Sequence, residues 1–271
     1  MSCRVITVTS MKGGVGKTET SLNLAAAIRK ETGKKVMLID FDIPYGGVAQ
    51  ALALKKYTSI SDWIKTNRNI SEEGVESLSI SHKTGIDILP AIANAHDVKR
   101  FSCEVAERII QNITLYYDFI VIDTGVDFSF ITQTALQKSD HIILVTSPQN
   151  TSIWNNHQYK EDIIQLGIHP QQILVFVNQV VENPDITFEQ VKEVFLHYGH
   201  RINSIFTAIQ DDRVRKNRNL RGVIYLDEPA ANFSRSIYSM LKILGIAIPD
   251  LKGRNKGWIS NLLRLKRRLF C

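Results

Sequence analysis

Residues 11–18 read Met-Lys-Gly-Gly-Val-Gly-Lys-Thr, and they stand between a β-rich run, Arg4–Thr9, and a helical stretch from Thr18 to about Lys30. Glycines let successive backbone N–H groups turn inward around phosphate oxygens, and the N-terminus of the following helix adds a favourable dipole. Lys17 would then neutralise the β- and γ-phosphates of a nucleotide, and the Thr18 hydroxyl would ligate Mg²⁺. A chance glycine-rich turn is the alternative, but strand, loop and helix all stand in the required order. The stretch therefore predicts a phosphate-binding loop of the Walker A type.

Short apolar runs alternate with helical stretches along the rest of the chain. The expected strands are Val36–Ile39, Ile86–Leu89, Phe119–Ile122, His141–Val145 and Ile173–Val177, and Phe101–Thr114 is expected to be a helix. Fully apolar strands separated by helices indicate a parallel sheet that is covered on both faces. We predict an α/β fold with a mostly parallel twisted sheet and helices on both faces. One domain would span residues 1–250, followed by a tail over residues 251–271.

The loop departs from the general Walker A pattern in a specific way. Position 11 is Met11 where the pattern has glycine, and Lys12 stands directly before the two glycines. This deviant form resembles the MinD/ParA family of P-loop ATPases, and the resemblance covers about residues 1–247. It implies ATP and Mg²⁺ as ligands, and a homodimer in which Lys12 reaches the nucleotide of the partner subunit, as an arginine finger does. A lone surface lysine is the alternative. The implied ATP-binding residues are Lys12, Gly13, Gly14, Val15, Gly16, Lys17, Thr18, Glu19 and Asn178.

Polar residues follow the expected strands where each one ends. Asp40 and Asp42 end the second strand, Asp123 ends the strand Phe119–Ile122, and Asn178 ends the strand Ile173–Val177. Ligand sites in open α/β sheets lie at this edge, and Mg²⁺ prefers carboxylates acting partly through water. The resemblance implies that Thr18, Asp40 and Asp123 hold the metal, and that Asn178 hydrogen-bonds the adenine. Strand-end residues that only cap turns are the alternative.

Catalysis is assigned by the same resemblance. Asp42 would orient or activate the attacking water, while Lys17 and Lys12 stabilise the transferred phosphoryl group. Hydrolysis would be slow, Mg²⁺-dependent and stimulated by a protein partner. Two positions depart from the family's pattern: Glu19 replaces a Ser or Thr near the α-phosphate, and no proline follows Asp123. A carboxylate at position 19 is unfavourable near phosphate unless it points away, and Gly125 could still offer a backbone N–H to the γ-phosphate.

The excess of basic residues that gives the chain its net charge of +6 is concentrated at its C-terminal end. Residues 252–271 contain seven Lys or Arg and no acid, which leaves 26 of the 33 basic residues against 27 acidic ones elsewhere. On a helical wheel the tail is amphipathic, which is typical of a helix that lies in a membrane interface. A helix docked on its own core, or on a protein partner, is the alternative. The predicted membrane-binding residues are Trp258, Ile259, Leu262, Leu263, Leu265, Leu269, Phe270, Arg264, Arg267 and Arg268.

The family resemblance, together with the tail, implies an ATPase that dimerises on ATP and docks on the inner face of the cell membrane as a peripheral cytoplasmic protein. It would position a cellular structure, such as the division site, a pilus or secretion system, or a flagellar apparatus, with a protein activator or cargo. Motifs after Asp40 resemble the CpaE/TadZ branch of the family and the tail resembles MinD, so the branch stays open. The cysteines Cys3, Cys103 and Cys271 fit neither a disulfide framework nor a metal site, and a reducing cytoplasm is the simplest location.

Two other classes of function stay open. A ParA-type partition ATPase would bind DNA without sequence preference, and a basic run next to Asp211 and Asp212 could contact phosphate backbones. That run contains Arg213, Arg215, Lys216, Arg218 and Arg221. We favour a solvated helix face for it. A regulator that binds nucleotide without turnover is the third class, and it would not need Asp42.

Overall fold

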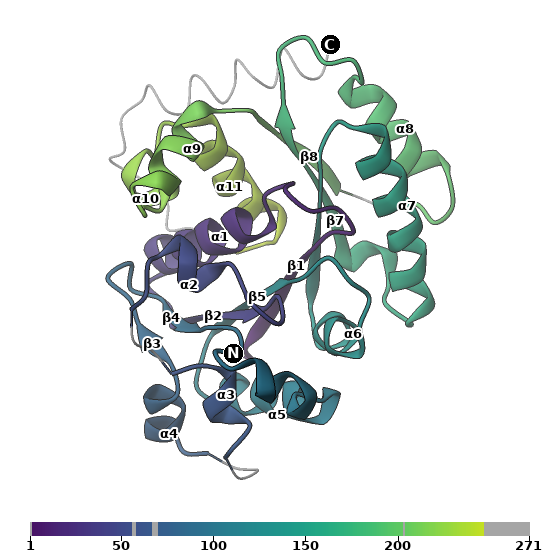
Figure 1. Cartoon of the computed structure of the whole chain (residues 1–271). Helices are drawn as coiled ribbons and strands as arrows, with labels where there is room; N and C mark the ends of the chain where they lie inside the picture. The colour runs from purple at the N-terminus through teal and green to yellow at the C-terminus, as the bar shows by residue number, and fades with distance from the viewer. Residues whose placement is uncertain (1, 56–57, 67–69, 203, 247–271) are drawn as a thin grey trace.

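A computed structural model describes residues 2–55, 58–66, 70–202 and 204–246. Its centre is an eight-stranded sheet with the order β3-β4-β2-β5-β1-β6-β7-β8 (Figure 1). All neighbouring strands are parallel except the pair β3–β4. The strands are β1 (Arg4–Thr9), β2 (Val36–Phe41), β3 (Ile80–Ser81), β4 (Asp87–Leu89), β5 (Phe119–Thr124), β6 (His141–Thr146), β7 (Ile173–Val180) and β8 (Ser204–Ile209). The predicted membrane-binding tail lies outside the described residues.

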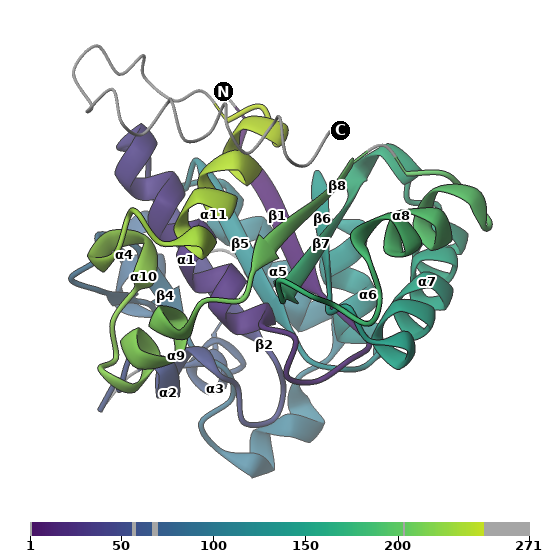
Figure 2. The same cartoon turned by 90° about the horizontal axis from the view of Figure 1, so that it is seen from above.

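Helices cover both faces of the sheet (Figures 1 and 2). On one face lie α1 (Lys17–Thr32), α9 (Asp212–Asn219), α10 (Ile224–Asp227) and α11 (Asn232–Ile243). On the other lie α5 (Cys103–Thr114), α6 (Phe130–Gln137), α7 (Asn150–Gln165) and α8 (Phe188–His197). Shorter helices are α2 (Val48–Ala51), α3 (Ile60–Trp63) and α4 (Glu72–Ser77), with 3₁₀ turns η1 (Ala95–Arg100) and η2 (Pro170–Gln172). The predicted parallel α/β sheet is confirmed.

The alternation of side chains along a strand explains why the strands are apolar throughout. In β2, Val36 and Leu38 belong to the core under α1 and α11, whereas Met37 and Ile39 belong to the core under α5. Successive side chains of a strand point to opposite faces, so a strand with a helix layer on each side has no face for polar residues. All six residues of β2 are buried, including Asp40.

Two strands were not predicted from the sequence, the two-residue strand β3 and strand β8. Both lie at the edges of the sheet, and five of the six residues of β8 are only partly buried. The sequence of β8, Ser-Ile-Phe-Thr-Ala-Ile, therefore lacks the continuous apolar run that marks the central strands. No helix within the described part of the chain is long and apolar enough to cross a membrane.

Parallel strands bring their carboxyl ends to one edge of the sheet. The glycine-rich loop follows β1, the Asp40–Asp42 run closes β2, Asp123 lies near the end of β5, and Asn178 lies near the end of β7. Register pairing places Asp40 directly beside Asp123. The edge that holds the loop therefore also gathers the carboxylates singled out by the sequence.

Candidate nucleotide-binding site

Helix α1 begins without a side-chain cap. Its N-cap is Gly16, in the left-handed conformation with φ 97°, and no side chain accepts a hydrogen bond from the first turn. The first N–H groups of a helix have no partner within the helix, so they are available to an anion. A long helix that starts in this way, directly after a glycine-rich loop, provides the donors that a phosphate group requires.

Side chains from β7 and α7 hold the loop in place. Asn178 donates from Nδ2 to the Val15 carbonyl at 2.8 Å, and Gln179 donates from Nε2 to the Gly14 carbonyl at 2.9 Å. Asn156 accepts the N–H of Met11 at 2.8 Å. A Cβ on Gly16 would lie 2.5 Å from Asn178 Nδ2, so the loop and the amide fit only with glycine there. Asn178 thus orients the loop through its amide nitrogen, and its oxygen remains for a ligand.

A cavity of about 620 Å³ opens beside the loop. Ile209, Val214 and Phe233 give it an apolar side, whereas Lys17, Thr18 and Asp42 give it a polar one. The remaining residues of the described lining are Gly13, Gly14, Gly16, Glu19, Val126, Asn178, Gln179, Gln210, Asp211, Asp212, Arg215 and Arg218. A site with one apolar and one charged side suits a ligand that has a flat apolar ring and an anionic group.

Lys17 is the buried cation of the site, with 8% of its surface exposed. Burial lowers the pKa of its ammonium group, while the charges of Asp123, Asp42 and Asp127 act in the opposite direction. The three carboxylates therefore offset part of the effect of burial on the Lys17 pKa. Lys17 follows the glycine-rich loop as the first residue of α1 and lines the cavity.

Asp40 and Asp123 are completely buried on neighbouring strands. Asp40 accepts the N–H groups of Gly47 and Val48, both at 2.9 Å, and Asp123 accepts the hydroxyl of Thr18 at 2.6 Å. Burial first, and then the negative charge of Asp123, raise the pKa of the Asp40 carboxyl. Burial is also the main cause that raises the pKa of Asp123.

These residues fit a magnesium ion that is held together with nucleotide phosphates. A cation near the two carboxylates would relieve their repulsion, and the Thr18 hydroxyl lies between the cavity and Asp123. The described residues include no cluster of three or more acidic, His or Cys side chains close enough to hold a metal alone. Mg²⁺ is usually bound by one or two carboxylates, waters and substrate phosphates, so this donor set suits it.

Asp42 lies near a second carboxylate, Asp127, for which the sequence predicts no role. A Cβ on Gly125 would lie 2.9 Å from both Asp42 Oδ1 and Asp127 Oδ2, so both carboxylates approach this glycine. Asp127 accepts the N–H of Ser129 at 2.9 Å and the hydroxyl of Thr132 at 2.7 Å. Burial, partly offset by Lys17, raises the pKa of Asp42. Among the described residues no donor bonds to the Asp42 carboxylate, and Asp42 lines the cavity, so its oxygens are open to a ligand there.

Four predicted site residues are not part of the cavity lining: Lys12, Val15, Asp40 and Asp123. Val15 is buried in the core under α1, and it reaches the site only through the loop backbone. Lys12 is half-buried at the start of the loop, with its N–H bonded to Ser10 Oγ at 3.1 Å. Glu19 lines the cavity, but its carboxylate turns toward α9. It accepts hydrogen bonds from Asn23 at 2.7 Å and from Arg218 at 3.0 Å.

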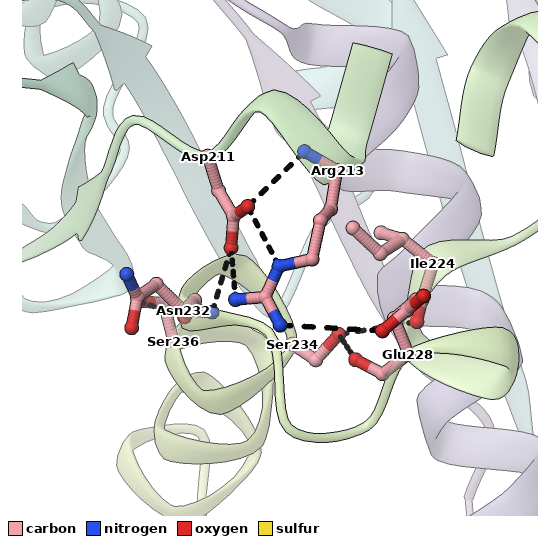
Figure 3. Close-up of polar contacts among 7 residues, drawn as sticks. All are labelled: Asp211, Arg213, Ile224, Glu228, Asn232, Ser234 and Ser236. Carbon is pink, nitrogen blue, oxygen red and sulfur yellow. Dashed lines mark hydrogen bonds and ion pairs between the residues drawn. The ribbon is translucent and has the colours of Figure 1, made fainter. Parts of the chain in front are cut away.

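The basic run of α9 is paired with acids for the most part. Arg213 binds Asp211 through Nε and Nη2, at 2.9 and 2.7 Å (Figure 3). Arg215 lies 3.9 Å from Asp212, and Arg218 binds Glu19 across 199 positions of sequence. The expectation of a solvated face beside Asp211 and Asp212 is thus incomplete, because Arg215 and Arg218 also line the cavity.

Comparisons with known proteins agree with this geometry. A family model described as an AAA domain matches residues 3–169. The chain is 30% identical to a ParA family protein of Chlamydia muridarum, over 76% of this chain and 77% of that one. It is 29% identical to the septum site-determining protein MinD of Synechocystis, over 68% and 71%. A match at 30% identity to an ATP-binding protein of Methanocaldococcus jannaschii spans 60% of each chain.

The fold has solved counterparts as well. The septum site-determining protein MinD of Pyrococcus horikoshii, complexed with Mg-ADP, superposes with a TM-score of 0.76 at 19% sequence identity. That superposition covers 93% of this chain and 100% of the other. With its P-loop after β1, its parallel sheet and its relatives at 30% identity, this chain belongs to the MinD/ParA family of P-loop ATPases.

Proposed function

We propose that this protein is a positioning ATPase that binds Mg-ATP in the cavity, dimerises on ATP, and docks on an anionic membrane while dimeric. The observation that carries the proposal is the uncapped start of α1 beside a cavity that both Lys17 and Asp42 line. Slow hydrolysis then acts as a timer that ends the dimeric state. The name of its septum site-determining relative supports a role in placing a cellular structure, together with a protein activator or cargo.

In this proposal the protein acts mainly by positioning the nucleotide phosphates and the attacking water. Loop N–H groups and the Lys17 ammonium hold the phosphates, and Asp42 accepts a hydrogen bond from the attacking water and directs its oxygen. Asn178 offers its amide oxygen to the adenine beside the apolar wall. Mg²⁺, when bound, supplies positive charge that offsets the charge developing on the phosphates. Thr18 would hold it directly, with Asp40 and Asp123 acting through water.

Exposed apolar side chains support a dimer. Tyr45 is 79% exposed and Phe130 is 77% exposed, and Val126 and Trp154 are also exposed. These residues follow β2, β5 and β6, so they lie toward the carboxyl edge of the sheet, and Val126 also lines the cavity. Exposed large apolar groups gathered on one edge favour a protein interface. A second copy meeting this edge would bring Lys12 of each chain toward the nucleotide of the other.

The membrane part of the proposal rests on the sequence of the tail. The sequence predicts a short helix there, with Trp258 and Phe270 on one side and three arginines, Arg264, Arg267 and Arg268, on the other. A helix of that kind suits an anionic interface. One such helix binds weakly, whereas two linked in a dimer bind better through effective concentration. ATP would thereby control membrane binding on the inner face of the cell membrane.

Sedimentation with anionic liposomes tests this switch. The whole chain should sediment more with Mg-ATP than with Mg-ADP, because only the ATP form carries two tails. A variant with Leu263→Asp, which places a charge on the apolar side of the tail, should stay in solution in both states. Equal sedimentation of the whole chain in ATP and ADP would contradict ATP-controlled membrane binding. Sedimentation of the Leu263→Asp variant would contradict binding through the tail.

DNA binding is the alternative to the membrane, and a regulator without turnover is the alternative to the ATPase. If the Leu263→Asp variant binds DNA with Mg-ATP but not with Mg-ADP, and salt weakens that binding, a ParA-type partition ATPase is favoured. Arg213 and Arg218 are already engaged by Asp211 and Glu19, which leaves fewer unpaired charges for phosphate backbones than the sequence indicated. The membrane reading is therefore preferred.

A further inference from the structure

An arginine far from the P-loop in sequence lies beside it in the fold. Arg218 lines the cavity and donates from Nε to Oε2 of Glu19 at 3.0 Å. Glu19 is 4% exposed and follows Thr18 directly, in the uncapped first turn of α1. An acidic side chain therefore shares a helix turn with the donors that face an anion. Alone, this carboxylate would repel a phosphate group.

Arg218 has donors left after it binds Glu19. Arg213, on the same helix, engages Asp211 with both Nε and Nη2, and its Nη1 lies 4.0 Å from Glu228 (Figure 3). Arg218 uses Nε only, and its Nη groups bond to nothing else among the described residues. Its side chain is 49% exposed and lies on the cavity wall. The guanidinium thus presents charged N–H groups to whatever enters the cavity.

Further hydrogen bonds hold both Glu19 and the helix that carries Arg218 in place. Asp211 at the start of α9 accepts the N–H of Asn232 at 3.0 Å, which ties α9 to α11 (Figure 3). Asn217 donates to Asp227 at 2.9 Å, which ties α9 to α10. Glu19 accepts from Asn23 at 2.7 Å, so its carboxylate is fixed on α1. A guanidinium held in this way loses little side-chain freedom when a ligand arrives.

We infer that Arg218 binds a phosphate group of the nucleotide and that Glu19 positions it for that contact. A guanidinium fork matches phosphate oxygens better than a single ammonium does. The bond to Glu19 uses Nε, so both Nη groups of Arg218 remain for a ligand. The residue that looks unfavourable in the sequence then serves to place a cation. This inference rests on the nucleotide binding proposed above and adds a binding residue to it.

Calorimetric titration with ADP tests the assignment in a set of four proteins. These are the wild type, Arg218→Gln, Glu19→Gln and the double variant. Arg218→Gln should weaken ADP binding by about tenfold or more, because a charge-assisted hydrogen bond is lost. The same loss should appear in the Glu19→Gln background. Raising the salt from about 0.05 M to about 0.5 M should reduce the loss, because an ionic contact at a half-exposed side chain is screened.

A control on the same helix is Lys216→Ala, which changes a basic residue outside the described cavity lining and should leave ADP affinity unchanged. If Glu19→Gln cancels the effect of Arg218→Gln, Arg218 only neutralises the acid and the inference is wrong. A loss that salt does not alter would assign Arg218 to the base or ribose, which also overturns it. The double variant leaves no buried unpaired carboxylate, so its comparison with Glu19→Gln holds even if Arg218→Gln alone folds poorly.

The ADP titration distinguishes failure of this inference from failure of the proposed function. A wild type that binds no ADP contradicts the proposed nucleotide site. A wild type that binds ADP as tightly as Arg218→Gln leaves that site intact and removes only the role of Arg218.

Discussion

Replacing Lys17 by alanine should abolish ATP hydrolysis, lowering turnover by about 10²–10³-fold or more, as expected for loss of a preorganised charge at the transferred group. Lys17 is buried beside three carboxylates, so its removal leaves the site strongly negative. A negative site repels a polyanionic ligand, and ADP binding should therefore fall together with turnover. Phosphate release and ADP titration measure the two effects.

Lys34→Ala provides the matched control for that result. Lys34 is an exposed lysine just before β2, at the opposite edge of the sheet, and it lies 3.4 Å from Asp118. Its loss should leave both turnover and ADP affinity unchanged, since surface ion pairs contribute little. Thermal unfolding of both variants separates a loss of fold from a loss of the site. Turnover above half of wild type in Lys17→Ala would place the chemistry elsewhere.

Replacing Asp42 by alanine should separate binding from hydrolysis. Asp42 is the half-buried carboxylate that faces the cavity near Gly125, and its proposed task is to direct the attacking water. Its loss should lower turnover by about 10²–10⁴-fold, the range for a positioned acid–base group. ATP affinity should be kept, because the loop and Lys17 remain. Single-turnover hydrolysis and ATP titration measure the pair of effects.

Asp127→Asn is the informative comparison for Asp42→Ala. Asp127 approaches the same glycine, but its Oδ1 is occupied by Ser129 and Thr132, so a positioning role in the loop suits it better. Its variant should lose much less turnover than Asp42→Ala does. Unchanged hydrolysis in Asp42→Ala would support a protein that binds nucleotide without turnover. A larger loss in Asp127→Asn would move the catalytic assignment to that residue.

Local sequence patterns were sufficient for the centre of the fold. The run Arg4–Thr9 coincides with β1, and α1, β2, β5 and β6 begin or end within two residues of their predicted bounds. The strands among them are buried on both faces of the sheet, so their apolar runs are continuous and easy to recognise. The family resemblance assigned Asp40 and Asp123 to the metal, and the pairing of β2 with β5 places them side by side.

Contacts across long sequence separations could not be predicted. Gln179 and Asn178 clamp carbonyls of the P-loop, and Arg218 reaches Glu19, from segments more than 160 positions away. Neither hydrophobic periodicity nor a local motif predicts which distant side chain makes such a contact. The sequence does not indicate where the Glu19 carboxylate points, and the structure shows that it accepts a hydrogen bond from Arg218 of α9.

The most direct test of the central claim is the mass of the Asp42→Ala protein in solution, measured by light scattering with Mg-ATP and again with Mg-ADP. Because this variant should bind ATP without consuming it, we expect twice the chain mass in ATP and the chain mass in ADP. A second variant, Asp42→Ala with Lys12→Ala, should stay monomeric in both, since Lys12 is the proposed contact with the partner's nucleotide. The same mass for Asp42→Ala in ATP and in ADP would contradict an ATP-controlled dimer.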